Sequence, residues 1–300
     1  MIMRFLVSVP CHLVPLGVSC DTSYMHYITF IGLTLLSKAT YKSLRGARVL
    51  VTGASTGIGE QMAYHYARFG AQIVITARRE NVLKKVAEKC LELGAQKALY
   101  VPADMGDTSD PGKVVEFAVE ALGGLDYLVL NHIGPSPFAM WDHDVEHVRW
   151  LMQVNFLSYV QMTSSALPHL DKSGGVVVVV SSMLGKMCNP FVAPYSATKF
   201  ALSGFFGTMQ HELAMQRKNV TVTISILGLI DTQSAMEKIK GYTNMTAYPA
   251  ADAALHVVKA GATRQRESFY PLYAYFACLF RDWFPFFRDL TIQNFYTYEP

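Results

Sequence analysis

The stretch RVLVTGASTGIG, residues 48–59, carries the strongest signal for the fold of this chain. Its first half is an apolar, β-branched run typical of a buried parallel strand. A glycine-rich turn and a helix-like apolar spacing follow, and a second apolar run occupies Gln72–Ala77. Such a strand–turn–helix–strand unit predicts a dinucleotide site, because the turn backbone can approach a pyrophosphate at the helix N-terminus. The residues expected to bind it are Gly53, Ser55, Thr56, Gly57, Ile58 and Gly59.

Two arginines after the second strand indicate which dinucleotide is bound. A site for NAD usually has an Asp or Glu here, which binds the ribose 2′-hydroxyl. This chain has Arg78 and Arg79 instead, and its first carboxylate comes at Glu80. Guanidinium groups pair well with a phosphate, so we expect NADP(H) with its 2′-phosphate near Arg78. Arg79 is open to a second interpretation, as a solvated residue that starts the next helix.

Strand and helix patterns continue to alternate beyond this unit. Further strands are predicted at Ala98–Val101, Asp126–Leu130, Val176–Ser182 and Thr221–Ile226. Helices are predicted near Lys113–Leu122, over Val145–Leu167 with Pro168 as its end, and from Tyr195 to about Met215. This alternation predicts one α/β domain over residues 45–268, a doubly wound parallel sheet (Rossmann fold) with helices on both faces.

A second motif, YSATK at residues 195–199, begins thirteen residues after Ser182. Tyr195 and Lys199 stand one turn apart on the same helix face. A nearby cation lowers the pKa of a phenol, which is otherwise ~10. Taken alone, the motif could simply open an ordinary helix. Because Ser182 ends a predicted central strand, we expect it to hold an alcohol or carbonyl oxygen with which Tyr195 exchanges a proton.

These motifs together resemble the short-chain dehydrogenase/reductase family over about residues 45–265. The resemblance implies that Ser182, Tyr195, Lys199 and Asn155 are catalytic, with Asn155 supporting a proton relay to the lysine. It implies that Asn131 stabilises the central sheet, and that Ser182 and Tyr195 also bind the substrate. The cofactor contacts that it implies beyond the turn and the arginines are Asp104, Met105, Asn131, His132, Ile133, Tyr195, Lys199, Ile230 and Thr232.

Several stretches resemble one branch of that family, the 11β-hydroxysteroid dehydrogenases of type 1 and type 1-like. They include LNHI (130–133), VNFLSY (154–159) and LGLIDT (227–232). The resemblance implies a secretory-pathway enzyme that uses NADP(H) on an 11-oxygenated steroid such as cortisol. Type 1 enzymes have a lysine where this chain has Thr56, so one cation expected near the 2′-phosphate is missing and Arg78 remains.

The substrate must contact the segment between the catalytic groups. Residues 183–194 are mostly apolar, which suits a flat hydrophobic alcohol or ketone. This segment alone does not distinguish a steroid from retinol or another lipid carbonyl. An alternative of another class is a non-catalytic dinucleotide-binding membrane protein, against which the complete catalytic set argues. Residues 233–248 are expected to form a mobile lid.

Composition and charge argue against nucleic-acid binding, a metal site and a disulfide framework. The 300 residues are 51% apolar, enough for one large core. A net charge of +3 without a basic stripe gives no indication of nucleic acid. The five cysteines are scattered and lack the spacing of metal ligands, so we expect neither a metal site nor a disulfide framework.

Both ends of the chain are expected to lie outside the catalytic domain. Residues 1–44 contain two apolar runs shorter than the ~20 residues of a membrane span, and predict a signal or anchor segment. Sequons at Asn219 and Asn244 agree with the endoplasmic reticulum lumen, or with secretion after cleavage of that segment. Residues 269–300 are dense in aromatics, which predicts contact with a membrane surface and with the second subunit of a homodimer.

Overall fold

A computed structural model describes residues 44–243 and 245–296 of the chain. The predicted signal or anchor segment lies outside the described residues apart from Leu44, and so does the sequon residue Asn244. The main sheet has seven strands: β1 (Arg48–Thr52), β2 (Gln72–Ala77), β3 (Lys97–Pro102), β4 (Tyr127–Leu130), β5 (Val176–Ser182), β6 (Thr221–Leu227) and β9 (Glu267–Tyr270).

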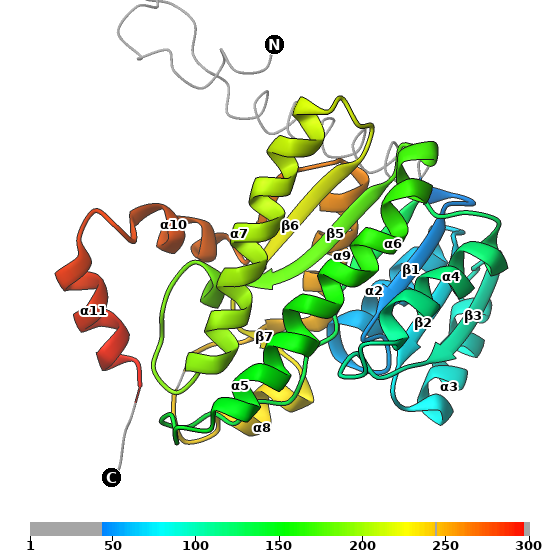
Figure 1. Cartoon of the computed structure of the whole chain (residues 1–300). Helices are drawn as coiled ribbons and strands as arrows, with labels where there is room; N and C mark the ends of the chain where they lie inside the picture. Colours follow the sequence, from blue (N-terminus) through cyan, green and yellow to red (C-terminus); the bar gives the residue numbers. More distant parts are fainter. Residues whose placement is uncertain (1–43, 244, 297–300) are drawn as a thin grey trace, which may run out of the picture. The chain divides into compact units, whose positions relative to one another are not determined.

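All seven strands run parallel, in the order β3-β2-β1-β4-β5-β6-β9 (Figure 1). The predicted doubly wound sheet is therefore confirmed. The strand order reverses at β1 and β4, and open sheets of this kind bind ligands beyond the carboxyl ends of the strands at the reversal. The glycine turn after β1 and Ser182 at the end of β5 both lie at this edge.

Helices cover both faces of the sheet. One face is packed by α2 (Gly57–Arg68), α3 (Glu80–Glu92) and α9 (Ala250–Ala262), and the other by α4 (Asp110–Leu122), α5 (Val145–Met152), α6 (Ser158–Ser173) and α7 (Ala193–Met215) (Figure 1). Successive strand residues face opposite cores: Leu50 and Val177 belong to the α4–α6–α7 core, Val49 and Val178 to the α2–α9 core. Burial on both faces explains why the strands are continuous apolar runs.

The prediction that Pro168 ends its helix is wrong, because α6 continues to Ser173. A proline inside a helix leaves the carbonyl four residues earlier without its N–H partner. Ser164 and Pro168 are both exposed, so water can bond that carbonyl. The predicted helix is instead divided by a π-helical turn over Gln153–Leu157, between α5 and α6.

A short parallel pairing holds together the two ends of the segment predicted to be a lid. Strand β7 (Ile230–Asp231) pairs with β8 (Tyr248–Pro249), with Ile230 opposite Tyr248. Helix α8 (Gln233–Ile239) lies between them. The pairing joins the two ends of the segment 233–248 next to the sheet. The mobility of this segment stays a prediction.

The last strand and two helices form the C-terminal region. Strand β9 lies across the predicted boundary between residues 268 and 269, so residues 269 and 270 belong to the sheet. Helices α10 (Leu272–Phe280) and α11 (Pro285–Asn294) follow, and the helices and the loop between them expose large apolar side chains, such as Phe286 on α11 and Trp283 in the loop. Within residues 44–243 and 245–296, every helix is too short or too polar to cross a bilayer.

Candidate active site

The turn between β1 and α2 has the close packing that a phosphate cradle requires. Gly53 and Gly57 both have φ of +64°, a conformation that favours glycine. A Cβ at Gly59 would lie 2.2 Å from the carbonyl oxygen of Gly53, so α2 packs directly on the turn. The side chain of Thr56 does not cap α2, and the first N–H groups of the helix can therefore receive an anion. The turn fits the pyrophosphate of a dinucleotide.

Arg79 is the arginine that lies over this turn. Its guanidinium donates to the hydroxyls of Ser55 at 3.2 Å and Thr56 at 3.4 Å. Arg78 is exposed and has no hydrogen bond or ion pair with any residue of 44–243 and 245–296. Arg79 is therefore held on the turn, while the placement of the 2′-phosphate near Arg78 and the alternative interpretation of Arg79 stay predictions.

The hydroxyl of Thr52 joins the glycine turn to the end of β4. It accepts from the backbone N–H of Asn131 at 2.9 Å and lies 2.8 Å from Nδ1 of His132. The Asn131 amide donates to the carbonyls of Thr52 and Gly53, as expected for a residue that stabilises the central sheet. His132 is buried, and its Nε2 lies 2.7 Å from the hydroxyl of Ser158. The imidazole ring of His132 therefore links Thr52, at the end of β1, to Ser158, at the start of α6.

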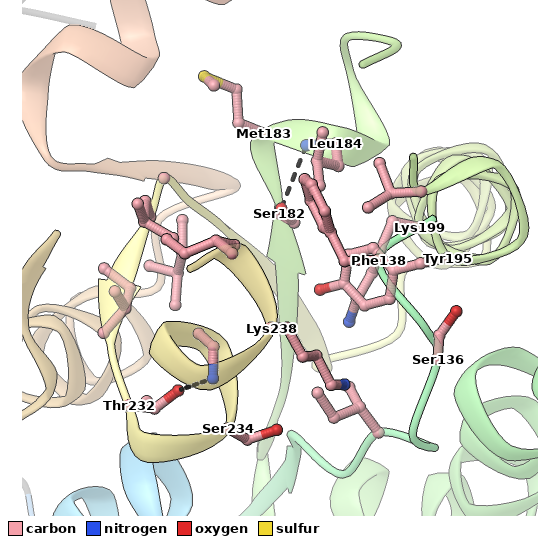
Figure 2. A pocket seen from close by; sticks show the side chains of 18 of the residues that line it. Ser136, Phe138, Ser182, Met183, Leu184, Tyr195, Lys199, Thr232, Ser234 and Lys238 are labelled. Carbon is pink, nitrogen blue, oxygen red and sulfur yellow. Dashed lines mark hydrogen bonds between the residues drawn. The ribbon is translucent and has the colours of Figure 1, made fainter. Parts of the chain in front are cut away.

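The three predicted catalytic side chains converge from β5 and α7. Ser182 Oγ accepts from the backbone N–H of Leu184 at 3.1 Å, and Ser182 lies close enough to Tyr195 to lower the pKa of its phenol. Lys199 is 2% exposed, and its Nζ donates to the carbonyl of Val180 at 3.0 Å. The same Nζ lies 5.6 Å from the ring centroid of Tyr195. Figure 2 shows Ser182, Tyr195 and Lys199 gathered on one side of a cavity.

Burial shifts the pKa values of the Tyr195–Lys199 pair toward the neutral forms. It raises the pKa of Tyr195 to about 12, although the hydrogen bond from Ser182 lowers it. It also lowers the pKa of Lys199 to about 7. The sequence argument expects a lowered tyrosine pKa, and the direction here differs because removal from water outweighs one hydrogen bond. With a pKa near neutrality, the lysine is poised to gain the charge that favours a phenolate.

The side chain of Asn155 hydrogen-bonds two separate segments of the site. It lies in the π-helical turn and is fully buried. Its Oδ1 accepts from the N–H of Gly134 at 2.7 Å, and its Nδ2 donates to the hydroxyl of Thr198 at 3.2 Å. Asn155 therefore fixes the loop after β4 against the residue that precedes Lys199, while the proton relay stays a prediction.

A cavity of about 270 Å³ opens beside the catalytic groups (Figure 2). Its wall combines Ser182, Tyr195 and Lys199 with mostly apolar side chains, among them Phe138, Met183, Leu184, Val192, Leu229 and Met245. Residue 296, close to the C-terminus, also lines it: the amide of Asn189 donates to the Tyr296 hydroxyl at 2.6 Å. Such a cavity suits an apolar molecule whose oxygen faces Ser182 and Tyr195.

Comparison with known proteins agrees with this geometry. A family model described as short chain dehydrogenase matches residues 47–243. The chain belongs to the short chain dehydrogenase family.

Curated relatives and solved structures in this family match most of the chain. The "Hydroxysteroid 11-beta-dehydrogenase 1-like protein" of Danio rerio is 71% identical over 259 residues, 86% of this chain and 90% of that protein. The protein of the same name in Gallus gallus is 64% identical over 77% of this chain and 80% of that protein. A short chain dehydrogenase from Burkholderia cenocepacia J2315, solved in complex with NADP, has a TM-score of 0.67 and 27% identity, covering 75% of this chain and 96% of that one.

The cofactor contacts implied by the short chain dehydrogenase resemblance fall into two groups. Ile58, Asn131, Ile133, Ile230 and Thr232 line the cavity together with the catalytic groups. The other group lies outside the wall: His132 is buried behind it, Met105 packs in the core, and Asp104 accepts from the N–H of Gly106 at 3.0 Å.

Three residues of the site were missed by sequence reasoning as contributors, and Thr52 was named only as the start of the glycine-rich stretch. Thr52 has one local signal, its place directly before Gly53. Ser136 and Lys238 line the cavity from the loop after β4 and from α8, and Tyr296 joins them from the last residues described. Lys238 lies in residues 233–248, the segment expected to form a lid, whereas nothing near Ser136 or Tyr296 in the sequence indicates that position.

Proposed function

We propose that this chain is an oxidoreductase that interconverts a hydroxyl and a ketone on a steroid, with NADP(H) as its cofactor. The observation that carries the proposal is the convergence of Ser182, Tyr195 and Lys199 on the wall of one largely apolar cavity. The printed name of the 71% identical relative, a hydroxysteroid dehydrogenase-like protein, supports a steroid as the substrate.

Two observations support NADP(H). The glycine turn and α2 fit a pyrophosphate, and Arg78 and Arg79 after β2 supply guanidinium groups that suit a 2′-phosphate. The 27% identical short chain dehydrogenase from Burkholderia cenocepacia was solved in complex with NADP. When bound, the nicotinamide supplies or accepts the hydride.

The residues of the chain then move the proton and hold the oxygen. In reduction Tyr195, protonated at neutral pH, donates its proton to the carbonyl oxygen, and in oxidation it takes the proton of the hydroxyl. Ser182 hydrogen-bonds the same oxygen. Lys199, in its ammonium form, stabilises the phenolate that reduction leaves on Tyr195. The apolar wall excludes water, so these charge interactions are stronger than they would be in solution.

The proposal is tested by following NADPH fluorescence during turnover of cortisol and cortisone by the full chain in detergent, with NAD(H) in parallel. We expect turnover with NADP(H), and loss of it in Tyr195→Phe with NADPH binding retained. Tyr100→Phe, at a partly exposed position on the edge strand β3, serves as the matched control. Loss of NADPH binding in Tyr195→Phe would show that the role is misassigned. Tight NADPH binding without steroid turnover would favour retinol or another lipid carbonyl instead.

We further propose that the enzyme resides in the secretory pathway, facing the endoplasmic reticulum lumen or secreted. The exposed sequon residue Asn219 supports this location. Glycosidase treatment of the protein from animal cells should increase its mobility on a gel, and Asn219→Gln should reduce that shift. An identical mobility of treated and untreated protein would contradict glycosylation.

The exposed aromatics of α10 and α11 support a proposed contact with a membrane and with a second subunit. Phe286 and Phe287 are 73% and 65% exposed, more than a soluble surface usually allows for adjacent phenylalanines. Phe286→Ser/Phe287→Ser should reduce flotation with phosphatidylcholine vesicles, while a matched change on α3, Leu91→Ser, should not. Unchanged flotation would contradict membrane contact by this surface, and sedimentation in detergent tests the dimer.

A further inference from the structure

Lys238 places a cation in the cavity that the proposed reaction does not use. It lies near the end of α8, is only partly exposed, and lines the cavity with Tyr195 and Lys199. The close-up shows its side chain pointing from α8 into the cavity (Figure 2). The side-chain ammonium group of Lys238 forms no ion pair and no hydrogen bond with residues 44–243 and 245–296. A ligand is thus the natural partner for this ammonium group.

The charged side chains of the cavity wall around this lysine are all positive. They are Lys199 and Lys238, and no carboxylate from the described part of the chain joins them. Lys199 already donates to the carbonyl of Val180. Partial burial without a counter-ion lowers the pKa of Lys238, which is a cost that an anion in the cavity would remove.

A neutral polar group also lacks a partner at this wall. The hydroxyl of Ser136 is buried and has no hydrogen bond with any described residue. Buried hydroxyls are usually bonded, and an orphan one calls for an explanation. Like the ammonium of Lys238, it can donate to an oxygen of a bound molecule.

We infer that Lys238 binds an anionic group of the substrate, with Ser136 as a further free donor on the cavity wall, so that the enzyme prefers steroids that carry an acid. This inference rests on the proposed function. The substrate class is an apolar alcohol or ketone that carries a carboxylate or sulfate at an atom other than the one whose oxygen Ser182 and Tyr195 hold.

The phosphates of the cofactor are less suitable partners for Lys238. Their cradle lies at the glycine turn, where the side chain of Thr232, just before α8, approaches Gly57. Lys238 follows Thr232 by six residues, which is about 9 Å along a helix. Arg79 already lies over the turn. The phosphates thus have partners of their own at the turn, and Lys238 is left for another anion.

The test uses two pairs of 11-oxygenated steroids that carry an acid at opposite ends of the skeleton. One pair is cortienic acid, with a 17β-carboxylate, and its methyl ester. The other is 11-oxoetiocholanolone 3-sulfate and the free 3-alcohol. For each pair, the ratio of kcat/KM for the acid to that for the neutral steroid is measured with the full chain. The variants are Lys238→Met, Lys238→Arg and, as matched control, Lys240→Met at an exposed position of the same segment.

We expect the wild type to prefer the acid of at least one pair, and Lys238→Met to reduce that preference about tenfold. Lys238→Arg and Lys240→Met should keep it, and the affinity for NADPH should be the same in all variants. The inference is overturned if Lys238→Met leaves both ratios unchanged. It is also overturned if Lys238→Met weakens NADPH binding tenfold, since the lysine would then serve the cofactor.

Failure of the proposed function gives a different result. If no steroid is turned over, calorimetric binding of each pair to the NADP+-loaded protein tests the inference by itself. Binding of an acid that depends on Lys238 would support the anion site without the reaction. Equal binding of acid and neutral steroid, or none, would overturn it.

Discussion

Protonation of the buried His132 should make the protein acid-sensitive. Burial, together with the nearby Lys199, lowers the pKa of His132 from 6.5 to about 3. In its neutral form the ring can donate through Nε2 to Ser158, and its Nδ1 lies 2.8 Å from the Thr52 hydroxyl. The unfolded chain binds a proton below pH 6.5 while the folded protein does not, so stability falls as the pH falls from 6.5 toward 3.

The magnitude follows from the two pKa values. Between pH 7 and pH 5 this one group should reduce the free energy of unfolding by about 2 kcal/mol. The result changes little if the folded pKa of His132 is one unit higher, because it still lies below pH 5. His132→Gln removes the titrating ring and should remove this part of the pH dependence, whatever its own stability at pH 7.

The assay is urea unfolding of wild type and His132→Gln at pH 7 and pH 5. The loss on acidification should be about 2 kcal/mol larger in the wild type than in the variant. His211→Gln, at an exposed position on α7, should lose as much as the wild type. Equal losses in wild type and His132→Gln would refute the reasoning and show that the folded protein accommodates a charged ring.

Three further predictions concern the turn and the catalytic lysine. Arg79→Gln should weaken NADPH binding about 30-fold, the loss of a charge-assisted bond of about 2 kcal/mol, with little effect on NADH. A larger effect of Arg78→Gln in the same fluorescence titration would reverse the assignment. Gly59→Ala should destabilise the protein by about 3 kcal/mol, because its Cβ would meet a backbone oxygen at 2.2 Å. Gly204→Ala, whose Cβ meets nothing within 4 Å, should stabilise by up to about 1 kcal/mol in urea unfolding; similar effects of the two changes would contradict this packing. Burial lowers the pKa of Lys199 from 10.5 to about 7, so the unfolded chain binds more protons between these values and stability should rise by about 2 kcal/mol from pH 7 to pH 9. Lys199→Met should lack this rise, and a rise of the same size in the variant would show that other groups cause it.

Local patterns were sufficient for most of the fold. The five-valine run before Ser182 became the central strand β5, and the glycine turn became the junction of β1 and α2. Both signals depend on neighbours within a few residues. Pro168 was misjudged because the cost of a helical proline depends on whether the freed carbonyl faces water, and that is a property of the packed helix.

The sequence by itself determined the parallel sheet, the cradle for a pyrophosphate, and the spacing of Tyr195 and Lys199 on one helix face. These follow from backbone sterics and from the periods of strand and helix, which act over a few residues. Only the tertiary structure decided that Arg79 rather than Arg78 lies over the turn, and that His132 is buried behind the site. It also decided that Lys238 enters the cavity. Each of these placements depends on contacts between side chains that are far apart in the sequence. The spacing of residues along the chain does not predict which distant segments come into contact.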